Sequence, residues 1–344
     1  MPKNVNKTVF LLPIIDKLMS VPLILKKAIC HELPRIIVLV GLPGSGKSTI
    51  AEKLKSKNMV IHSSDVLRQE LYGDAKHQEH NTELFVELHR RIKRDLECGK
   101  NVIYDATNIS KKRRISFLQG LSNIPCKKIC LCVMTPYELC LERNRFRERR
   151  VPELVIKKMY MSWCPPAIQE GFDDIHYIYN YGDNSEAIKH RYKFTTLFQG
   201  DCGIDNFEQE NSHHRLTLGK HCREAYKYTT EHFSANSLLH VAALLHDIGK
   251  VFTKTKLNAK GDEDGECHYY QHQCVGAYES LFYTNELGLN KSEKTYIANL
   301  IYFHMHPYRA WKQSKNAMMR HKKQMGEEMF EDVIRLHEAD RAAH

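Results

Sequence analysis

A short apolar run that leads directly into a glycine-rich loop constrains the fold of this chain more than any other feature. Residues 36–40 read IIVLV, and residues 41–49 read GLPGSGKST. A continuous apolar run of this length is typical of a strand that is covered on both faces of a parallel sheet. The loop matches the phosphate-binding pattern GxxxxGK[ST], and the residues after it favour a helix. The sequence therefore predicts a strand, a phosphate-binding loop and a helix in succession.

The chemistry of this loop indicates binding of ATP with Mg²⁺. Glycines let backbone N–H groups close around phosphates, and the first turn of the next helix adds positive potential. Lys47 can reach the outer phosphates, and the hydroxyl of Ser48 can hold Mg²⁺. The residues expected to contact the nucleotide are Gly41, Gly44, Ser45, Gly46, Lys47, Ser48 and Thr49.

The remainder of the first half alternates between strand and helix patterns. Between the strands, Leu84, Leu88, Ile92 and Leu96 form one helical stripe, and Gly99 is expected to end that helix. Such alternation predicts a parallel α/β sheet with flanking helices. Further strands are expected at residues 59–65, 101–105, 128–134 and 175–180.

The chain of 344 residues is long enough for two domains. After residue 200 the strand patterns largely vanish and helical patterns remain, which places a boundary near residue 205. We therefore expect a helical extension in residues 1–34, an α/β domain in residues 35–200 and an all-α domain in residues 205–344.

Charged residues follow two of the expected strands. The second expected strand ends in Asp65, with Arg68 one helical turn on, and the third ends in Asp105. In an open α/β sheet, ligands bind at the carboxyl ends of the strands. The Asp65 carboxylate can accept a proton from an attacking hydroxyl while Arg68 holds a phosphate, although a helix N-cap is an alternative role for Asp65. Residues 142–150 (ERNRFRERR) suit either a solvated basic helix or a lid over the transferred phosphoryl group.

The ordered set GxxxxGKS, SSDxxR, DxTN and RNxxR before Val-Pro resembles the polynucleotide 5′-kinase family over roughly residues 35–180. This resemblance implies that Asp65 is the general base, that Arg68 contacts a phosphate of the acceptor and that Arg147 is the lid arginine. It also implies that Asp105 and Asn108 order the site. The sequence departs from the pattern at one point, where Ala106 adds a residue after the aspartate.

The second half contains an apolar segment, LLHDIGK, in which His246 and Asp247 are adjacent. An imidazole nitrogen and a carboxylate oxygen can bind one transition-metal ion. With His221 before it and Asp340 after it, the segment resembles the HD phosphohydrolase superfamily over roughly residues 205–344. The resemblance implies a divalent metal (Mn²⁺, Ni²⁺, Co²⁺ or Fe²⁺) that activates water against a phosphoester, and Asp247 then serves catalysis as well as binding. The implied ligands are His221, His246, Asp247 and Asp340.

Further histidines surround this segment. By the same resemblance, His272 and His304 are expected to bind a second metal ion. Lys250 suits either a phosphate contact or a helix cap. We expect other roles, in substrate contact or at the surface, for His213, His214 and His306.

The net charge of +10 gives weak support for a polyanionic partner. Eleven cysteines without framework spacing indicate reduced thiols and a cytoplasmic protein, and Cys126, Cys130 and Cys132 are expected in the core rather than on zinc. We expect no signal peptide and no membrane span.

Together the halves resemble bacterial end-healing enzymes that fuse an HD phosphohydrolase to a polynucleotide kinase, with the order reversed. Phosphorylation of 5′-OH ends of RNA or DNA, removal of a 3′-phosphate or 2′,3′-cyclic phosphate and a separate ligase partner are therefore expected. Two alternatives remain: a small-molecule or nucleoside kinase fused to a nucleotide phosphohydrolase, and an ATP-gated nucleic-acid binder without turnover.

Overall fold

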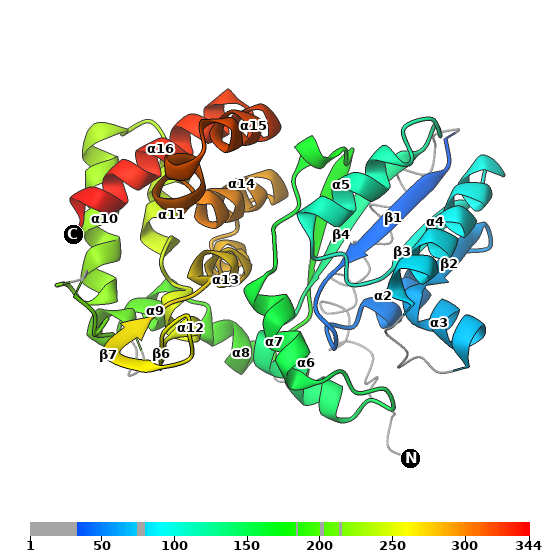
Figure 1. The fold of residues 1–344 in the computed structure, drawn as a ribbon, viewed down its shortest axis with the longest axis horizontal. Coiled ribbons are helices and arrows are strands. Elements are labelled where there is room, and N and C mark those ends of the chain that lie inside the picture. The colour runs from blue at the N-terminus through cyan, green and yellow to red at the C-terminus, as the bar shows by residue number, and fades with distance from the viewer. Residues whose placement is uncertain (1–32, 74–79, 184, 200–202, 213–214) are drawn as a thin grey trace, which may run out of the picture.

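The computed structural model describes residues 33–73, 80–183, 185–199, 203–212 and 215–344. The helical extension predicted for residues 1–34 lies almost wholly outside these residues, as do His213 and His214. Figure 1 shows two adjoining lobes, one built around a sheet and the other made mostly of helices. This arrangement confirms the predicted fold class.

The first lobe is organised around a five-stranded parallel sheet with the strand order β2-β3-β1-β4-β5. The central strand is β1 (Arg35–Val40), and all six of its residues are buried, as expected for a strand covered on both faces. Its neighbours are β3 (Asn101–Asp105) and β4 (Lys127–Met134), and the outer strands are β2 (Met59–Ser63) and β5 (Asp174–Tyr179).

Helices cover the sheet and bring polar residues to the carboxyl ends of its strands (Figure 1). The phosphate-binding loop connects β1 to the first described helix, and Asp65 lies in the first turn of the helix after β2. The helices are α2 (Lys47–Leu54), α3 (Ser64–Tyr72), α4 (Asn81–Glu97), α5 (Lys111–Gln119), α6 (Tyr137–Arg145) and α7 (Glu153–Met161).

The arginine-rich segment is only partly helical, which corrects the expectation of one basic helix. Helix α6 ends at Arg145, so Arg147 and Arg149 lie in the loop before α7. The side chain of Asn144 closes this loop, because its Nδ2 donates to the carbonyl of Val151 at 2.8 Å and its Oδ1 accepts from the N–H of Val151 at 2.9 Å. A loop can direct several arginines toward one point, whereas a helix would distribute them around its axis.

The second lobe is a helical assembly that includes one small hairpin. The hairpin pairs β6 (Thr255–Leu257) with β7 (Glu263–His268) and departs from the purely helical expectation. Its strands are mostly exposed and polar, so no apolar alternation marks them in the sequence. The helices are α10 (Leu218–His232), α11 (Ser237–Leu245), α12 (Lys250–Thr253), α13 (His272–Glu286), α14 (Lys291–Phe303), α15 (Lys315–Met325) and α16 (Glu327–Ala342), with a π-helical turn at Pro307–Trp311.

The lobes share one apolar core. Two short helices, α8 (Ser185–Arg191) and α9 (Phe194–Gln199), connect them. Between α8 and α9, Tyr192 stacks on Phe282 of α13 with ring centroids 4.6 Å apart. Trp163 of the first lobe is fully buried against Tyr278 of the same helix. Helix α13 is therefore the main element of the second lobe at this interface.

Cys126, Cys130 and Cys132 are buried in the core of the first lobe, as expected. Within the described ranges, the groups of side chains that could hold a metal ion contain no cysteine. None of the described helices is long and apolar enough to cross a bilayer.

Candidate active sites

The phosphate-binding loop adopts a conformation that requires its glycines. Gly44 and Gly46 have φ angles of +83° and +93°, which side-chain-bearing residues rarely adopt. A Cβ atom at Gly44 would also lie 2.3 Å from the carbonyl oxygen of Cys140. The Nζ of Lys47 donates to the carbonyl of Leu42 at 2.8 Å, so the cation lies within the loop. Burial lowers the pKa of Lys47 from its ordinary value, although the nearby Asp105 and Asp65 carboxylates act in the opposite direction.

Ser48 and Asp105 meet beside this loop. The hydroxyl of Ser48 donates to Oδ2 of Asp105 at 2.8 Å, and Asp105 is buried. In phosphate-binding loops of this class, the loop Ser or Thr and an Asp from a neighbouring strand hold Mg²⁺. The pair has the donor chemistry for that ion. The sequence predicted only Ser48 as a Mg²⁺ ligand. The one sequence signal for Asp105 was its position at the end of a strand. That this strand lies next to β1 is known only from the strand order of the sheet.

Asp65 lies in an open pocket lined by arginines. The pocket has a volume of about 730 Å³, and Asp65, Arg147 and Arg149 are among its lining residues. Asp65 forms an ion pair with Arg149, lies 3.9 Å from Arg147 and lies 3.4 Å from Arg68. The lining also includes Val66, Gln69, Glu70 and Glu148. The structure thus brings the predicted base, acceptor arginine and lid arginine together and adds Arg149, which spacing alone did not distinguish.

The loop after β3 is held by a buried ion pair. Arg114 contacts both carboxylate oxygens of Glu170 at 2.7 Å. Its remaining N–H groups donate to the carbonyls of Asn108, Ile109 and Pro165. Asn108, in a left-handed conformation with φ of 47°, donates from Nδ2 to the carbonyl of Leu39 at 2.9 Å. These bonds orient the backbone next to β1, and Arg114 is too buried to reach a ligand.

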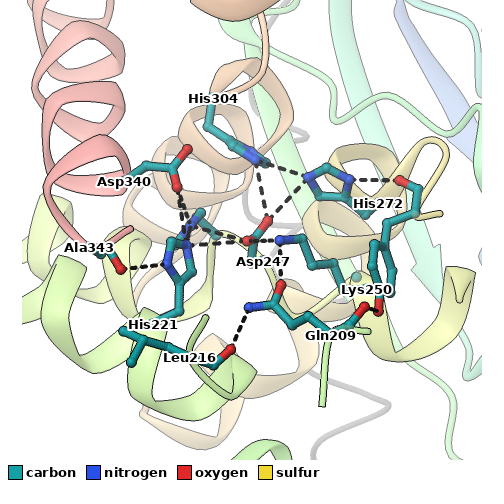
Figure 2. Close-up of polar contacts among 12 residues, drawn as sticks. Gln209, Leu216, His221, Asp247, Lys250, His272, His304, Asp340 and Ala343 are labelled. Carbon is teal, nitrogen blue, oxygen red and sulfur yellow. Dashed lines mark hydrogen bonds and ion pairs between the residues drawn. The ribbon is translucent and has the colours of Figure 1, made fainter. Parts of the chain in front are cut away.

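In the second lobe, four buried side chains converge from three parts of the chain: His221 from α10, His246 and Asp247 from the turn after α11, and Asp340 from α16 (Figure 2). The Nε2 atom of His221, in α10, lies 3.1 Å from Nε2 of His246 and 3.1 Å from Oδ1 of Asp340, in α16. It lies 3.4 Å from Oδ2 of Asp247. Ligands that surround one ion at 2.0–2.2 Å are themselves roughly 3–3.5 Å apart. The spacing of this group therefore fits a single divalent ion.

A second group shares one carboxylate with the first. His272 and His304 have Nε2 atoms 3.2 Å apart, and these lie 3.1 Å and 3.6 Å from Oδ1 of Asp247. Because Oδ2 of Asp247 faces the first group, Asp247 presents one oxygen to each group (Figure 2). The two groups together have the donors that could hold two divalent ions, with Asp247 belonging to both groups.

Hydrogen bonds orient all four imidazoles in the same way. Each Nδ1 lies within bonding distance of a backbone carbonyl, which makes Nδ1 the donor and leaves the Nε2 lone pair facing the cluster. Lone pairs that face each other at about 3 Å repel unless a cation lies between them. The residues therefore fit a metal ion. The carbonyl partners are Ala343, Ala243, Tyr269 and Ile301 for His221, His246, His272 and His304.

The electrostatics of the cluster favour a cation there. Burial alone would raise the pKa of Asp247, but Lys250 and His246 hold it well below its ordinary value. Burial would likewise lower the pKa of His221, yet the Asp247 and Asp340 carboxylates raise it to about 9. These carboxylates make the potential at the cluster negative, which favours a bound cation.

Lys250 belongs to the edge of this cluster rather than to a helix cap. It begins α12, and its Nζ lies 2.7 Å from Oδ2 of Asp247 and donates to Oε1 of Gln209 at 2.8 Å. Gln209 was not predicted, because it lies in an irregular segment without a motif. His306 lies apart from these groups, where it packs on Phe303 and His321.

Two family models match the chain. The AAA domain model matches residues 36–166, and the HD domain model matches residues 213–343.

Among curated proteins, the chain is 28% identical over 150 residues to the L-seryl-tRNA(Sec) kinase of Methanococcus maripaludis, covering 40% of this chain and 56% of that protein. It is 25% identical over 152 residues to the bifunctional polynucleotide phosphatase/kinase of Schizosaccharomyces pombe, covering 42% of this chain and 33% of that protein. A UPF0200 protein of Sulfurisphaera tokodaii is 31% identical over 135 residues, covering 37% of this chain and 73% of that protein. The chain thus spans about half of the first relative and a third of the second.

Among solved structures, the chain is similar to one in the Pnkp1/Rnl/Hen1 RNA repair complex. The identity is 26% and the TM-score 0.33, with 40% of this chain and 46% of that chain covered.

Proposed function

We propose that this chain heals broken nucleic-acid ends, because residues 36–166 match the AAA domain model and residues 213–343 match the HD domain model. One site would phosphorylate a 5′-OH end with ATP. The other would remove a 3′-phosphate or a 2′,3′-cyclic phosphate with the help of a divalent metal. The position of Asp65, in an arginine-lined pocket beside the phosphate-binding loop, is the main support for this proposal.

In the proposed kinase reaction, the γ-phosphate of ATP lies at Lys47, and the acceptor hydroxyl lies at Asp65. Asp65 takes the proton of the hydroxyl as the new O–P bond forms and the bond between the γ-phosphorus and ADP breaks. Arg147 and Arg149 neutralise charge on the transferred group, and Arg68 holds a phosphate of the acceptor. The pocket is open, so the rest of a polynucleotide can remain outside it.

In the proposed phosphohydrolase reaction, one metal ion would be held by His221, His246, Asp247 and Asp340, and a second would be held by His272 and His304 together with Asp247. A bound divalent metal would supply Lewis acidity and lower the pKa of water at the site. Imidazole with carboxylate suits Mn²⁺, Fe²⁺, Co²⁺ or Ni²⁺. Lys250, at the edge of the cluster, would bind the phosphate of the substrate, and its contact with Asp247 supports this role.

The two reactions complement each other chemically. Cleavage that leaves a 5′-OH beside a 2′,3′-cyclic or 3′-phosphate produces ends that a ligase cannot join, and this chain would correct both. A separate ligase would then consume the product. The similarity to a polynucleotide phosphatase/kinase supports a polynucleotide acceptor, and the net charge of +10 is consistent with one.

A small-molecule acceptor is the second candidate. The kinase lobe is also 24% identical over 180 residues to an adenylate kinase of Thermotoga neapolitana, which by its name acts on a mononucleotide. In that case the HD site would hydrolyse a nucleotide. A preference for free nucleosides or nucleotides over oligonucleotides would favour this candidate.

The test uses purified protein, ATP, Mg²⁺ or Mn²⁺ and an RNA oligonucleotide with a 5′-OH and a 2′,3′-cyclic phosphate, with products resolved by mass. A DNA oligonucleotide with a 5′-OH and a 3′-phosphate runs in parallel. We expect a 5′-phosphate to form except with Lys47→Ala, and the terminal phosphate to be lost except with Asp247→Ala. Unchanged oligonucleotides alongside modified mononucleotides would replace the proposal with the second candidate. Tight ATP-dependent RNA binding without any product would indicate a binder instead.

A further inference from the structure

Helix α13 of the HD domain reaches from the metal cluster to the lobe that contains the phosphate-binding loop. Its first residue is His272, in the cluster, and two turns later Tyr278 enters the interface. Tyr278 is fully buried, and its ring packs edge-on against Tyr160 and Trp163 of the first lobe. The helix therefore carries a residue of the metal cluster at its start and residues of the lobe interface further along.

The hydroxyl of Tyr278 is bonded to the residue that supports the loop. It donates to the carbonyl of Thr135 at 2.6 Å. The hydroxyl of Thr135 in turn donates to the carbonyl of Ser45, within the phosphate-binding loop, at 2.9 Å. Asn180 donates to the same carbonyl at 3.1 Å. Burial raises the pKa of Tyr278 well above its ordinary value, so its hydroxyl stays protonated as a donor.

This contact has a clear consequence for the loop. A carbonyl of Ser45 that is held outward from the phosphates leaves the N–H groups of the following residues free to face them. Thr135 and Ser45 are both fully buried, so water cannot easily replace a lost partner. Without Tyr278 the buried carbonyl of Thr135 would keep only a weak thiol donor, Cys140 Sγ at 3.6 Å, which is costly, and the backbone at Thr135 would shift to find a better one.

We propose that Tyr278 is a positioning residue for the phosphate-binding loop, so that the HD domain completes the nucleotide site of the kinase domain. The inference depends on the nucleotide binding assumed in the proposed function. The inference goes beyond the proposed function because the nucleotide site of one domain would then depend on a side chain of the other domain.

The position of Tyr278 depends in turn on tight packing just before it, in the first turns of α13. A Cβ atom at Gly249 would lie 2.0 Å from the carbonyl oxygen of His272 and 2.6 Å from the backbone nitrogen of Gly276. The backbone turn after Asp247 is thus packed closely against the backbone of the first two turns of α13. Displacement of that turn would move the helix on which Tyr278 lies.

The test compares Tyr278→Phe with Tyr177→Phe in the full chain. Tyr177→Phe is the matched control, because the Tyr177 hydroxyl also crosses the interface, where it bonds to Thr295 at 2.7 Å. Affinity for ATP with Mg²⁺ is measured by calorimetry, and KM for ATP and kcat are measured with the oligonucleotide. For Tyr278→Phe we expect ATP affinity to fall about five- to tenfold, with KM raised more than kcat is lowered. The control should keep the affinity of the unchanged chain.

A double variant tests whether Tyr278 acts on the loop through Thr135 or through the overall stability of the lobe interface. Thr135→Val removes the bond to Ser45, so adding Tyr278→Phe to it should lower ATP affinity little further. Unchanged affinity in Tyr278→Phe, an equal loss in Tyr177→Phe, or full additivity in the double variant would overturn the inference alone. Failure of the unchanged chain to bind ATP would overturn both the inference and the proposed kinase.

Discussion

The hydroxyl of Ser48 donates a hydrogen bond of 2.8 Å to the carboxylate of Asp105, which joins the phosphate-binding loop to the neighbouring strand β3. The two residues are 57 positions apart in the chain. They meet because β3 pairs with β1 in parallel and ends at the same edge of the sheet. This relationship extends the predicted Mg²⁺ site from one residue to two.

We therefore expect Asp105→Asn to lower the proposed kinase turnover about a hundredfold, because one negative charge on the Mg²⁺ side is lost. The Mg²⁺ concentration for half-maximal activity should rise, as a titration of initial rates would show. Asp95→Asn is the control, since Asp95 is another buried carboxylate of this lobe that pairs with His62. Equal Mg²⁺ requirements in both variants would contradict a role in metal binding.

Asp65→Asn should leave ATP bound but slow phosphoryl transfer by roughly 10²–10⁴-fold, because the acceptor hydroxyl loses its proton acceptor. Single-turnover rates and ATP affinity, measured separately, would show the split. Glu52→Gln, at an exposed acid in α2, provides a control for change of charge. The N-cap of α3 is Ser63, so Asp65 does not cap the helix. If Asp65→Asn instead unfolded the chain or abolished ATP binding, a structural role through the ion pairs of Asp65 with Arg68 and Arg149 would be the better account.

Substitutions in the two groups of candidate metal ligands should each change the metal content of the protein separately. We expect the unchanged chain to hold two ions, and His272→Ala to lose one while the group of His221, His246, Asp247 and Asp340 keeps the other. Elemental analysis after dialysis measures this directly. His232→Ala, at an exposed histidine of α10, should keep full metal content. Loss of all metal in His272→Ala would argue against two separable ions.

Stability should depend on pH through Glu279, which lies buried at the lobe interface. Tyr160 and Tyr192 donate to its carboxylate at 2.6 Å and 3.2 Å. Burial raises the pKa of Glu279 from 4.5 to about 7, and among the nearby charged groups Glu138 raises it while Arg191 lowers it. The folded protein therefore keeps this proton at pH values where the unfolded chain has lost it.

The raised pKa of Glu279 makes the folded protein more stable at low pH than at neutral pH. The stabilising contribution is complete below about pH 4.5 and is lost as the pH rises to about 7. Glu279→Gln should remove this dependence and exceed the unchanged chain by up to about 3 kcal/mol in unfolding free energy above pH 7. Urea unfolding across this pH range would measure the difference. Glu286→Gln, at an exposed acid on the same helix, should keep the original pH profile.

Some of this protein was determined by its sequence alone, because the information is local. A phosphate-binding loop needs its glycines, lysine and serine at a fixed spacing, and an apolar strand before the loop indicates a parallel sheet. The fold class followed from such patterns. The candidate metal ligands were also named in advance by the resemblance of their order, although their roles remain predictions.

Other features depended on the tertiary structure, because they join residues that no local pattern relates. Periodicity shows that a helix has an apolar face but not which partner covers it. Three contacts therefore appear only once the helices and strands are packed: Ser48 with Asp105, Asp65 with Arg149, and Asp247 with the two histidine groups. The same holds for Tyr278, whose bond to Thr135 spans 143 positions and links two domains that the sequence presents as separate units.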